Sequence, residues 1–201
     1  ISMLDDSTYE QTESINLLIP SGQPITISQA STEVLVSDNE LAPVLSFNNV
    51  SGTEGGSSII TFSIPAVIDF DVTAQFPASA LVTFNPASVS IPSGSLTQDI
   101  TITLVDNVTD EADRNLTLTL ENPSNTLIQQ TLDIVIADDD TPSTVTFGGV
   151  TAEVIEGDAS SIEFTLDRAS GFDISVPLTI AGSASSTDYS FSTTTVLIPA
   201  G

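Results

Sequence analysis

Isoleucine and leucine alternate with threonine along two central segments of the chain, 100–104 and 116–120. An apolar face opposite a threonine face is the pattern of a half-buried β-strand, and threonine itself favours strands. Further strands are expected between residues of proline, glycine, asparagine and serine, at 44–47, 58–64, 70–76, 82–84, 88–91 and 132–136. Some seven short strands within roughly 100 residues, without a helical period, predict an all-β chain of immunoglobulin-like antiparallel β-sandwiches.

The sequence repeats itself with a spacing of roughly 100 residues, which is typical of a tandem array. The matching segments are 10–17 with 111–118, 36–40 with 136–140, 45–55 with 145–157, and 89–94 with 196–201. These matches predict one complete repeat flanked by two half repeats. The expected parts are the C-terminal half of a first repeat at 1–42, a complete second repeat at 43–142, and the N-terminal half of a third repeat at 143–201.

The charged residues are few, and almost all of them are acidic. The chain has 27 Asp and Glu residues against two Lys or Arg, a formal net charge of −25, yet only 14% of its residues are charged. This balance excludes nucleic acid and anionic lipid as partners, because both require cationic surfaces. Cys and His are absent, which excludes disulfides and a His-dependent catalytic triad. The acidic residues gather in short clusters, which favours cation-binding sites over a generally charged surface.

Acidic motifs recur at the ends of the predicted strands. A Glu-Gly pair follows the first strand of a repeat, an acidic hairpin lies at 5–13 and again at 106–113, and an acidic exit lies at 38–40 and again at 138–140. One such motif alone could be a solvated linker or a turn, but their joint recurrence favours a site at one edge of the sandwich. Oxygen ligands without His or Cys favour calcium, which takes about six to eight of them, over zinc or copper.

Together with an Asp-Tyr pair at 188–189 and Pro-x-Gly motifs at 92–94 and 199–201, these motifs resemble the Calx-β family, known from sodium–calcium exchangers and large extracellular adhesion proteins. The resemblance covers essentially the whole chain. It implies a β-sandwich that holds Ca²⁺ at one end, beside the next domain. The metal ligands that it implies are Asp5, Asp6, Glu10, Glu13, Asp38, Glu40, Glu54, Asp106, Glu111, Asp138, Asp139, Asp140, Glu156 and Asp188.

The second repeat departs from the family pattern in its acidic residues. Leu81 stands where the Asp of the Asp-Tyr pair is expected, and Arg114 stands where the first repeat has Glu13. Asn107 likewise replaces Asp6. We therefore expect the second repeat to have lost part of its site, with the Arg114 guanidinium bridging the remaining carboxylates.

The function expected from these features is a calcium-stiffened structural array in a large secreted or cell-surface adhesin or filament protein. Its expected partners are neighbouring repeats of the same or another copy of the chain, paired head to tail through complementary half repeats. A surface or glycan ligand could be bound through other domains, and no membrane insertion is expected. Two alternatives stay open: a calcium-sensing regulatory module of a membrane transporter, and a surface ligand-binding module. Paired carboxylates could serve a glycosidase, but the chain has no Trp and only two Tyr to hold a sugar, so no enzyme activity is expected.

Overall fold

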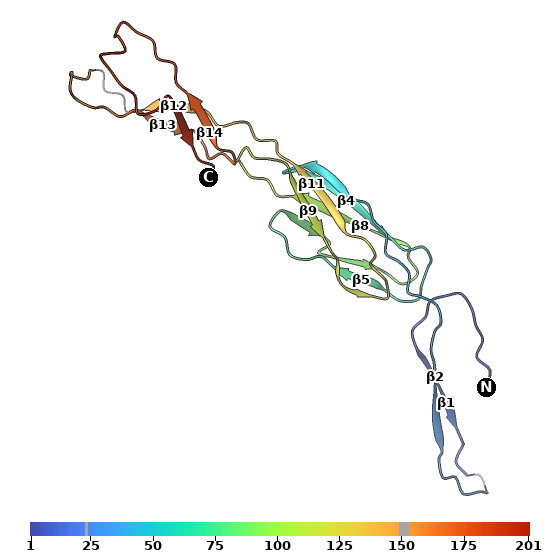
Figure 1. The fold of residues 1–201 in the computed structure, drawn as a ribbon. Helices are drawn as coiled ribbons and strands as arrows, with labels where there is room; N and C mark the ends of the chain where they lie inside the picture. Colours follow the sequence, from blue (N-terminus) through green and yellow to red (C-terminus); the bar gives the residue numbers. More distant parts are fainter. Residues whose placement is uncertain (23, 149–152) are drawn as a thin grey trace. The chain divides into compact units, whose positions relative to one another are not determined.

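The computed structural model describes residues 1–22, 24–148 and 153–201 (Figure 1). These residues form β-strands connected by turns and loops and contain no helix, which confirms the all-β class. The described part of the chain accordingly offers no helix that is long and apolar enough to cross a membrane. The strands are β1 (Glu13–Leu18), β2 (Ser31–Val36), β3 (Val50–Thr53), β4 (Ser57–Ser63), β5 (Val72–Gln75), β6 (Val82–Asn85), β7 (Ser88–Ile91), β8 (Thr97–Leu104), β9 (Arg114–Leu118), β10 (Glu121–Ser124), β11 (Leu132–Ala137), β12 (Val145–Gly148), β13 (Glu163–Leu166), β14 (Ile174–Pro177) and β15 (Thr195–Ile198).

The chain packs as two compact units. The first consists of Ile1–Val50, Ser57–Thr103 and Thr117–Ile134. The second consists of Ser51–Gly56, Leu104–Leu116 and Val135–Gly201. The division of the sequence into repeats at 1–42, 43–142 and 143–201 stays a prediction.

The apolar core of the first unit lies among the central strands. Three-stranded sheets have the orders β4-β8-β6 and β10-β5-β7, and β3, β11 and β9 form a third sheet in the order β3-β11-β9. Strands β4 and β8 pair in antiparallel register, with Ile60 opposite Ile100. Ile100 and Ile102 are fully buried, whereas Thr101 between them is exposed, so the predicted alternation is confirmed. Phe62 packs in the same core, with its ring centroid 5.0 Å from that of Phe47.

The strand expected at 44–47 is reduced to two isolated bridges, and two further strands occur that the pattern does not predict. Val44 pairs with Leu127, and Ser46 pairs with Ser63, although Leu45 and Phe47 are buried as an alternating strand requires. Strand β3 contains a single large apolar residue and a glycine, and β10 contains Asn and Pro, so neither carries an alternating signal. Tertiary pairing rather than local preference forms both of these strands.

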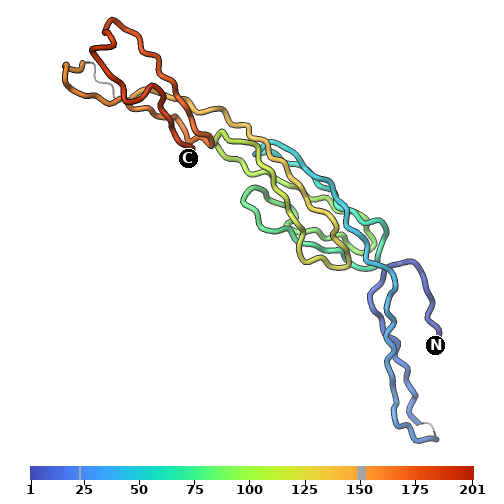
Figure 2. Tube along the Cα trace, in the orientation of Figure 1, coloured from blue at the N-terminus to red at the C-terminus, as the bar shows by residue number. Residues whose placement is uncertain are grey.

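The N-terminal part of the first unit is a two-stranded hairpin with little cover. Strands β1 and β2 pair from Glu13 opposite Val36 to Leu18 opposite Ser31. Figure 2 shows the two strands side by side, in blue. Every residue of β1 is exposed, including its apolar ones, and Leu35 of β2 is exposed as well. The hairpin therefore forms its backbone hydrogen bonds without burying an apolar face.

The C-terminal part of the second unit consists of two hairpins. Strand β12 pairs with β13, with Val145 opposite Leu166. Strand β14 pairs with β15, with Ile174 opposite Ile198. In the first unit β5 pairs with β7 in a similar way, with Val72 opposite Ile91, and Ile91 and Ile198 lie at matching positions of the repeated segments 89–94 and 196–201.

Candidate metal centre

The first of two carboxylate clusters lies where strands β3, β8 and β11 end. The backbone N–H of Glu54 donates to the carbonyl of Ala137 at 3.0 Å, and the N–H of Gly55 donates to the carbonyl of Leu104 at 3.0 Å. These two bonds bring together the residue after β3, the last residue of β11 and the last residue of β8. The acidic residues that follow each strand therefore come to one edge, as the motif spacing predicts.

Gly55 is required by the backbone at this junction. Its φ is +72°, in the left-handed region that side chains disfavour. A Cβ placed there would lie 3.3 Å from Cγ of Asp106. The Glu-Gly motif thus combines a buried carboxylate with a turn that passes close to the side chain of Asp106.

Glu54, Glu111 and Asp138 form the centre of this cluster. Each offers a carboxylate oxygen, and these oxygens all lie within 4.8 Å of one another. Glu54 is only 3% exposed. Two buried oxygens of the cluster, Oε1 of Glu54 and Oδ1 of Asp138, have no hydrogen-bond partner. Burial raises the pKa of Glu54, and the neighbouring Asp138 raises it further, while Arg114 and Asn107 oppose the shift.

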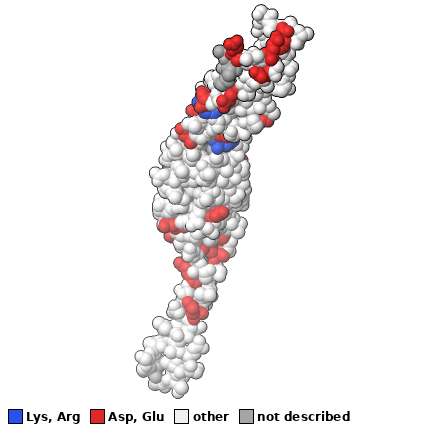
Figure 3. Space-filling model, turned by 90° about the vertical axis from the view of Figure 1, so that its left-hand side faces the viewer, with Lys and Arg blue, Asp and Glu red and all other residues white. Residues whose placement is uncertain are grey.

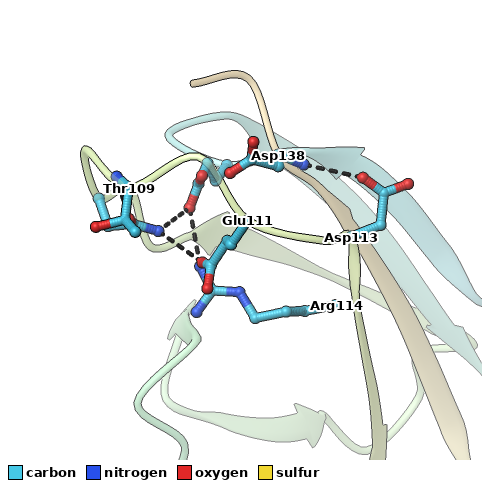
Figure 4. A network of polar contacts seen from close by, with 7 residues as sticks. Thr109, Glu111, Asp113, Arg114 and Asp138 are labelled. Carbon is cyan, nitrogen blue, oxygen red and sulfur yellow. Dashed lines mark hydrogen bonds and ion pairs between the residues drawn. The ribbon is translucent and has the colours of Figure 1, made fainter. Parts of the chain in front are cut away.

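Nitrogen donors occupy the other side of the same cluster. Asn107 Nδ2 donates to Oε2 of Glu54 at 2.7 Å and to Oε1 of Glu111 at 3.0 Å. Arg114 Nη2 donates to the same Oε2 of Glu54 at 3.0 Å and forms an ion pair with Oε1 of Glu111. Figure 4 draws this network, with Arg114 reaching Glu111 from β9. The expectation that Arg114 bridges the remaining carboxylates of the second repeat is confirmed.

The acidic exit after β11 continues the cluster. The backbone N–H of Asp138 donates to Oδ1 of Asp113 at 3.2 Å, which fixes the start of the exit against the segment between β8 and β9 (Figure 4). This segment connects strands of two different sheets, so the acidic hairpin expected at 106–113 is not formed. Asp139 is exposed. Burial raises the pKa of Asp140, as do Asp138 and Asp139, and its Oδ2 is buried without a partner. Arg168 partly offsets this shift.

A second cluster contains all the ligands predicted for the first repeat. A cavity of about 60 Å³ is lined by the carboxylate residues Asp5, Asp6, Glu10, Glu13, Asp38 and Glu40. The β1–β2 hairpin brings Glu13 opposite Val36, so the residues that precede β1 and follow β2 meet at its base. The backbone N–H of Glu10 donates to Oδ2 of Asp38 at 3.0 Å.

Like charges dominate the electrostatics of this second cluster. Repulsion from Asp6 raises the pKa of Glu10, with smaller contributions from burial and from Glu13 and Asp38. A hydrogen bond with Asp38 raises the pKa of Glu40, whereas the backbone N–H of Glu10 lowers that of Asp38. The residues that line the cavity include no Arg or Lys. On the face drawn in Figure 3 the acidic side chains likewise gather in separate patches, with most other surface uncharged.

Glu156 and Asp188 are the two candidate ligands of the third repeat. Among the described residues, neither contacts a residue of either cluster. Glu156 lies in an exposed turn closed by the N–H of Asp158, which donates to the carbonyl of Ile155. The Asp188 carboxylate accepts hydrogen bonds from the N–H and the hydroxyl of Ser185, and the backbone bond lowers its pKa. These local bonds form a turn, and the role of both residues as ligands stays a prediction.

Neither a protein-family model nor a curated protein matches the chain. Among solved structures, the apo form of the Calx CBD1 domain is 20% identical with a TM-score of 0.41, over 50% of this chain and 100% of that domain. The CBD12 structure from CALX1.2 is 19% identical with a TM-score of 0.39, over 52% of this chain and 48% of the other. Domains 4 and 5 of the S-layer protein SbsC are 14% identical with a TM-score of 0.28, over 64% of this chain and 69% of the other. Similarities of this size assign no function to the chain.

Asn107, which is neutral, and Arg168, which is cationic, lie near the acidic residues, and the sequence pattern predicts a binding role for neither. Asn107 was identified only as a lost acid, yet its amide holds both Glu54 and Glu111. Arg168, which donates to the Thr141 hydroxyl at 2.7 Å and influences Asp140, carries no signal in the repeat pattern. The presence of only two cationic residues in the chain could have drawn attention to both arginines.

Proposed function

We propose that the chain is a calcium-binding structural module whose ions stiffen an array of β-sandwich repeats. The observation that carries the proposal is Glu54, whose side chain is fully buried while its Oε1 and the neighbouring Oδ1 of Asp138 lack any hydrogen-bond partner. Buried polar atoms are almost always paired, so two neighbouring carboxylate oxygens of this kind are suited to share a cation. Carboxylates that converge in this way suit Ca²⁺.

The choice of calcium follows from the donors available. Both clusters offer carboxylate oxygens and side-chain amides, with neither His nor Cys in the sequence. Hard oxygen donors of this kind select calcium or magnesium over zinc and copper. Calcium tolerates irregular shells of about six to eight oxygens, whereas magnesium requires near-ideal octahedral geometry. The irregular spacing of carboxylates on hairpins and strand ends favours calcium.

The setting we propose is a large secreted or cell-surface adhesin or filament protein. An acidic chain without Cys has no disulfides to stabilise it outside the cell, and metal ions can take that role. The repeats in the sequence support an array in which neighbouring repeats, in the same or another copy of the chain, are the partners. The same features support a structural role rather than an enzymatic one.

Calorimetric titration of calcium into the wild-type chain and the Glu54→Gln variant tests the proposal. Gln keeps the shape of the side chain but removes its charge, so we expect the variant to lose about one bound ion per chain. Glu33→Gln is the matched control, because Glu33 is exposed on β2 and belongs to neither cluster. The proposal fails if the wild-type chain binds no calcium, or if both substitutions leave the stoichiometry unchanged.

A further inference from the structure

The two oxygens of the Glu54 carboxylate have different surroundings. Its Oε2 accepts hydrogen bonds from Asn107 and Arg114, at 2.7 and 3.0 Å. Its Oε1 is buried and has no partner, and neither has Oδ1 of the neighbouring Asp138. The cluster thus has nitrogen donors on one side, here called the nitrogen side, and buried carboxylate oxygens without a hydrogen-bond partner on the other.

On the nitrogen side, the Arg114 guanidinium already supplies the positive charge that a metal ion would otherwise bring to these carboxylates. Arg114 Nη2 contacts both Oε2 of Glu54 and Oε1 of Glu111, so a single cationic atom bridges two carboxylates. Asn107 Nδ2 bridges the same two oxygens. A metal ion bound to these oxygens would have to displace both donors.

The first repeat provides the comparison within the same chain. At the positions of Arg114 and Asn107 its sequence has Glu13 and Asp6, and both of these carboxylates line the acidic cavity. The replacement of Glu by Arg changes the local charge by two, and the replacement of Asp by Asn changes it by a further one. The second repeat therefore has two nitrogen donors, Arg114 and Asn107, at positions where the first repeat has two carboxylates.

We propose that Arg114, assisted by Asn107, takes the place of one calcium ion in the second repeat, so that its cluster binds calcium only on the side of Glu54 Oε1 and Asp138. The inference rests on the calcium-binding function proposed above. Arg114 then sets the number of ions at this cluster and holds the segment between β8 and β9 in place when calcium is absent. The cluster at the base of the β1–β2 hairpin has no such internal cation and depends on metal alone.

Titration calorimetry with CaCl₂ on the Arg114→Ala chain tests this proposal. Removal of the guanidinium leaves Oε2 of Glu54 and Oε1 of Glu111 with only the neutral Asn107 amide, which calcium can displace, so we expect about one more calcium ion per chain than in the wild type. The melting temperature in chelator should fall, and calcium should restore it, because the metal can replace the lost charge. In a Glu54→Gln background the additional ion should disappear, which places it at this cluster.

Gln29→Glu is the charge-matched control, since it also changes the net charge by −1 and Gln29 is exposed between β1 and β2, in neither cluster. It should leave the number of bound ions unchanged. If Arg114→Ala does not fold in chelator, folding on addition of calcium supports the proposal, and failure to fold in calcium as well contradicts it. Unchanged stoichiometry in Arg114→Ala, while Glu54→Gln still loses an ion from the wild type, overturns the role of Arg114 and leaves the calcium function intact.

Discussion

At the scale of single residues, Gly55 connects backbone geometry to the metal site. A side chain at this position would come close to Asp106. The positive φ of this residue would also cost about 1–2 kcal/mol for any residue other than glycine. We predict that Gly55→Ala lowers the free energy of unfolding by about that amount in urea denaturation. It should also weaken calcium binding by about tenfold, as displaced supporting groups commonly do.

Gly94→Ala separates the two effects of that substitution. Gly94 also has a positive φ, of +77°, but a Cβ there would meet no atom within 4 Å. It should therefore cost a similar free energy of unfolding without altering calcium affinity. An equal loss of affinity in both variants would show that Asp106 is not held by Gly55 for metal binding.

Residue identities in the two main clusters were predictable because each repeat carries the same acidic motifs. The Glu-Gly pair predicts Glu54, and the motif at 106–113 predicts Glu111 together with its four counterparts at 5–13. The acidic exit predicts Asp138 and its counterparts Asp38 and Glu40. The burial of Glu54 was not predictable, because it depends on the hydrogen bonds that join the ends of β3, β8 and β11. The position of Arg168 near Asp140 was not predictable either, because no repeated motif includes Arg168.

At the scale of elements, the alternation of apolar and threonine residues predicted the strands that have one buried face. It gave no sign of β3 and β10, whose residues lack alternation, and it predicted a full strand at 44–47 where only two bridges form. These segments are defined by their partners rather than by their own pattern. Local sequence was therefore most informative where burial itself alternates.

The β1–β2 hairpin leads to a prediction about association. Leu17 is 41% exposed, whereas Leu118, its counterpart in the complete repeat, is 6% exposed. An apolar face that is buried in one repeat and exposed in another favours pairing with a second copy of the chain. We expect the chain to associate with increasing concentration in sedimentation velocity experiments. Leu17→Ser should raise the dissociation constant by about tenfold or more, through the loss of leucine burial.

Leu41→Ser is the control for that experiment, because Leu41 is exposed but lies outside any strand. It should leave the dissociation constant unchanged. A chain that remains monomeric at all concentrations, or that responds equally to both substitutions, would contradict pairing through the hairpin face.

At the scale of the whole molecule, the chain has a net charge of −25, and many of its acidic residues lie in clusters. The carboxylates within each cluster repel one another when no cation is bound. The two arginines lie near the acidic residues of the second repeat, and the first repeat has no internal cation in its cavity. Stability should therefore depend on calcium through every cluster that lacks its own positive charge.

The most direct test is the melting temperature of the wild-type chain in calcium, in magnesium and in chelator. A ligand bound only by the native state at about 100 times its Kd adds about 2.7 kcal/mol to the free energy of unfolding. We predict a rise of several degrees in calcium over chelator, and a much smaller rise in magnesium. A melting temperature that is the same in calcium and in chelator would contradict a structural role for calcium in this chain.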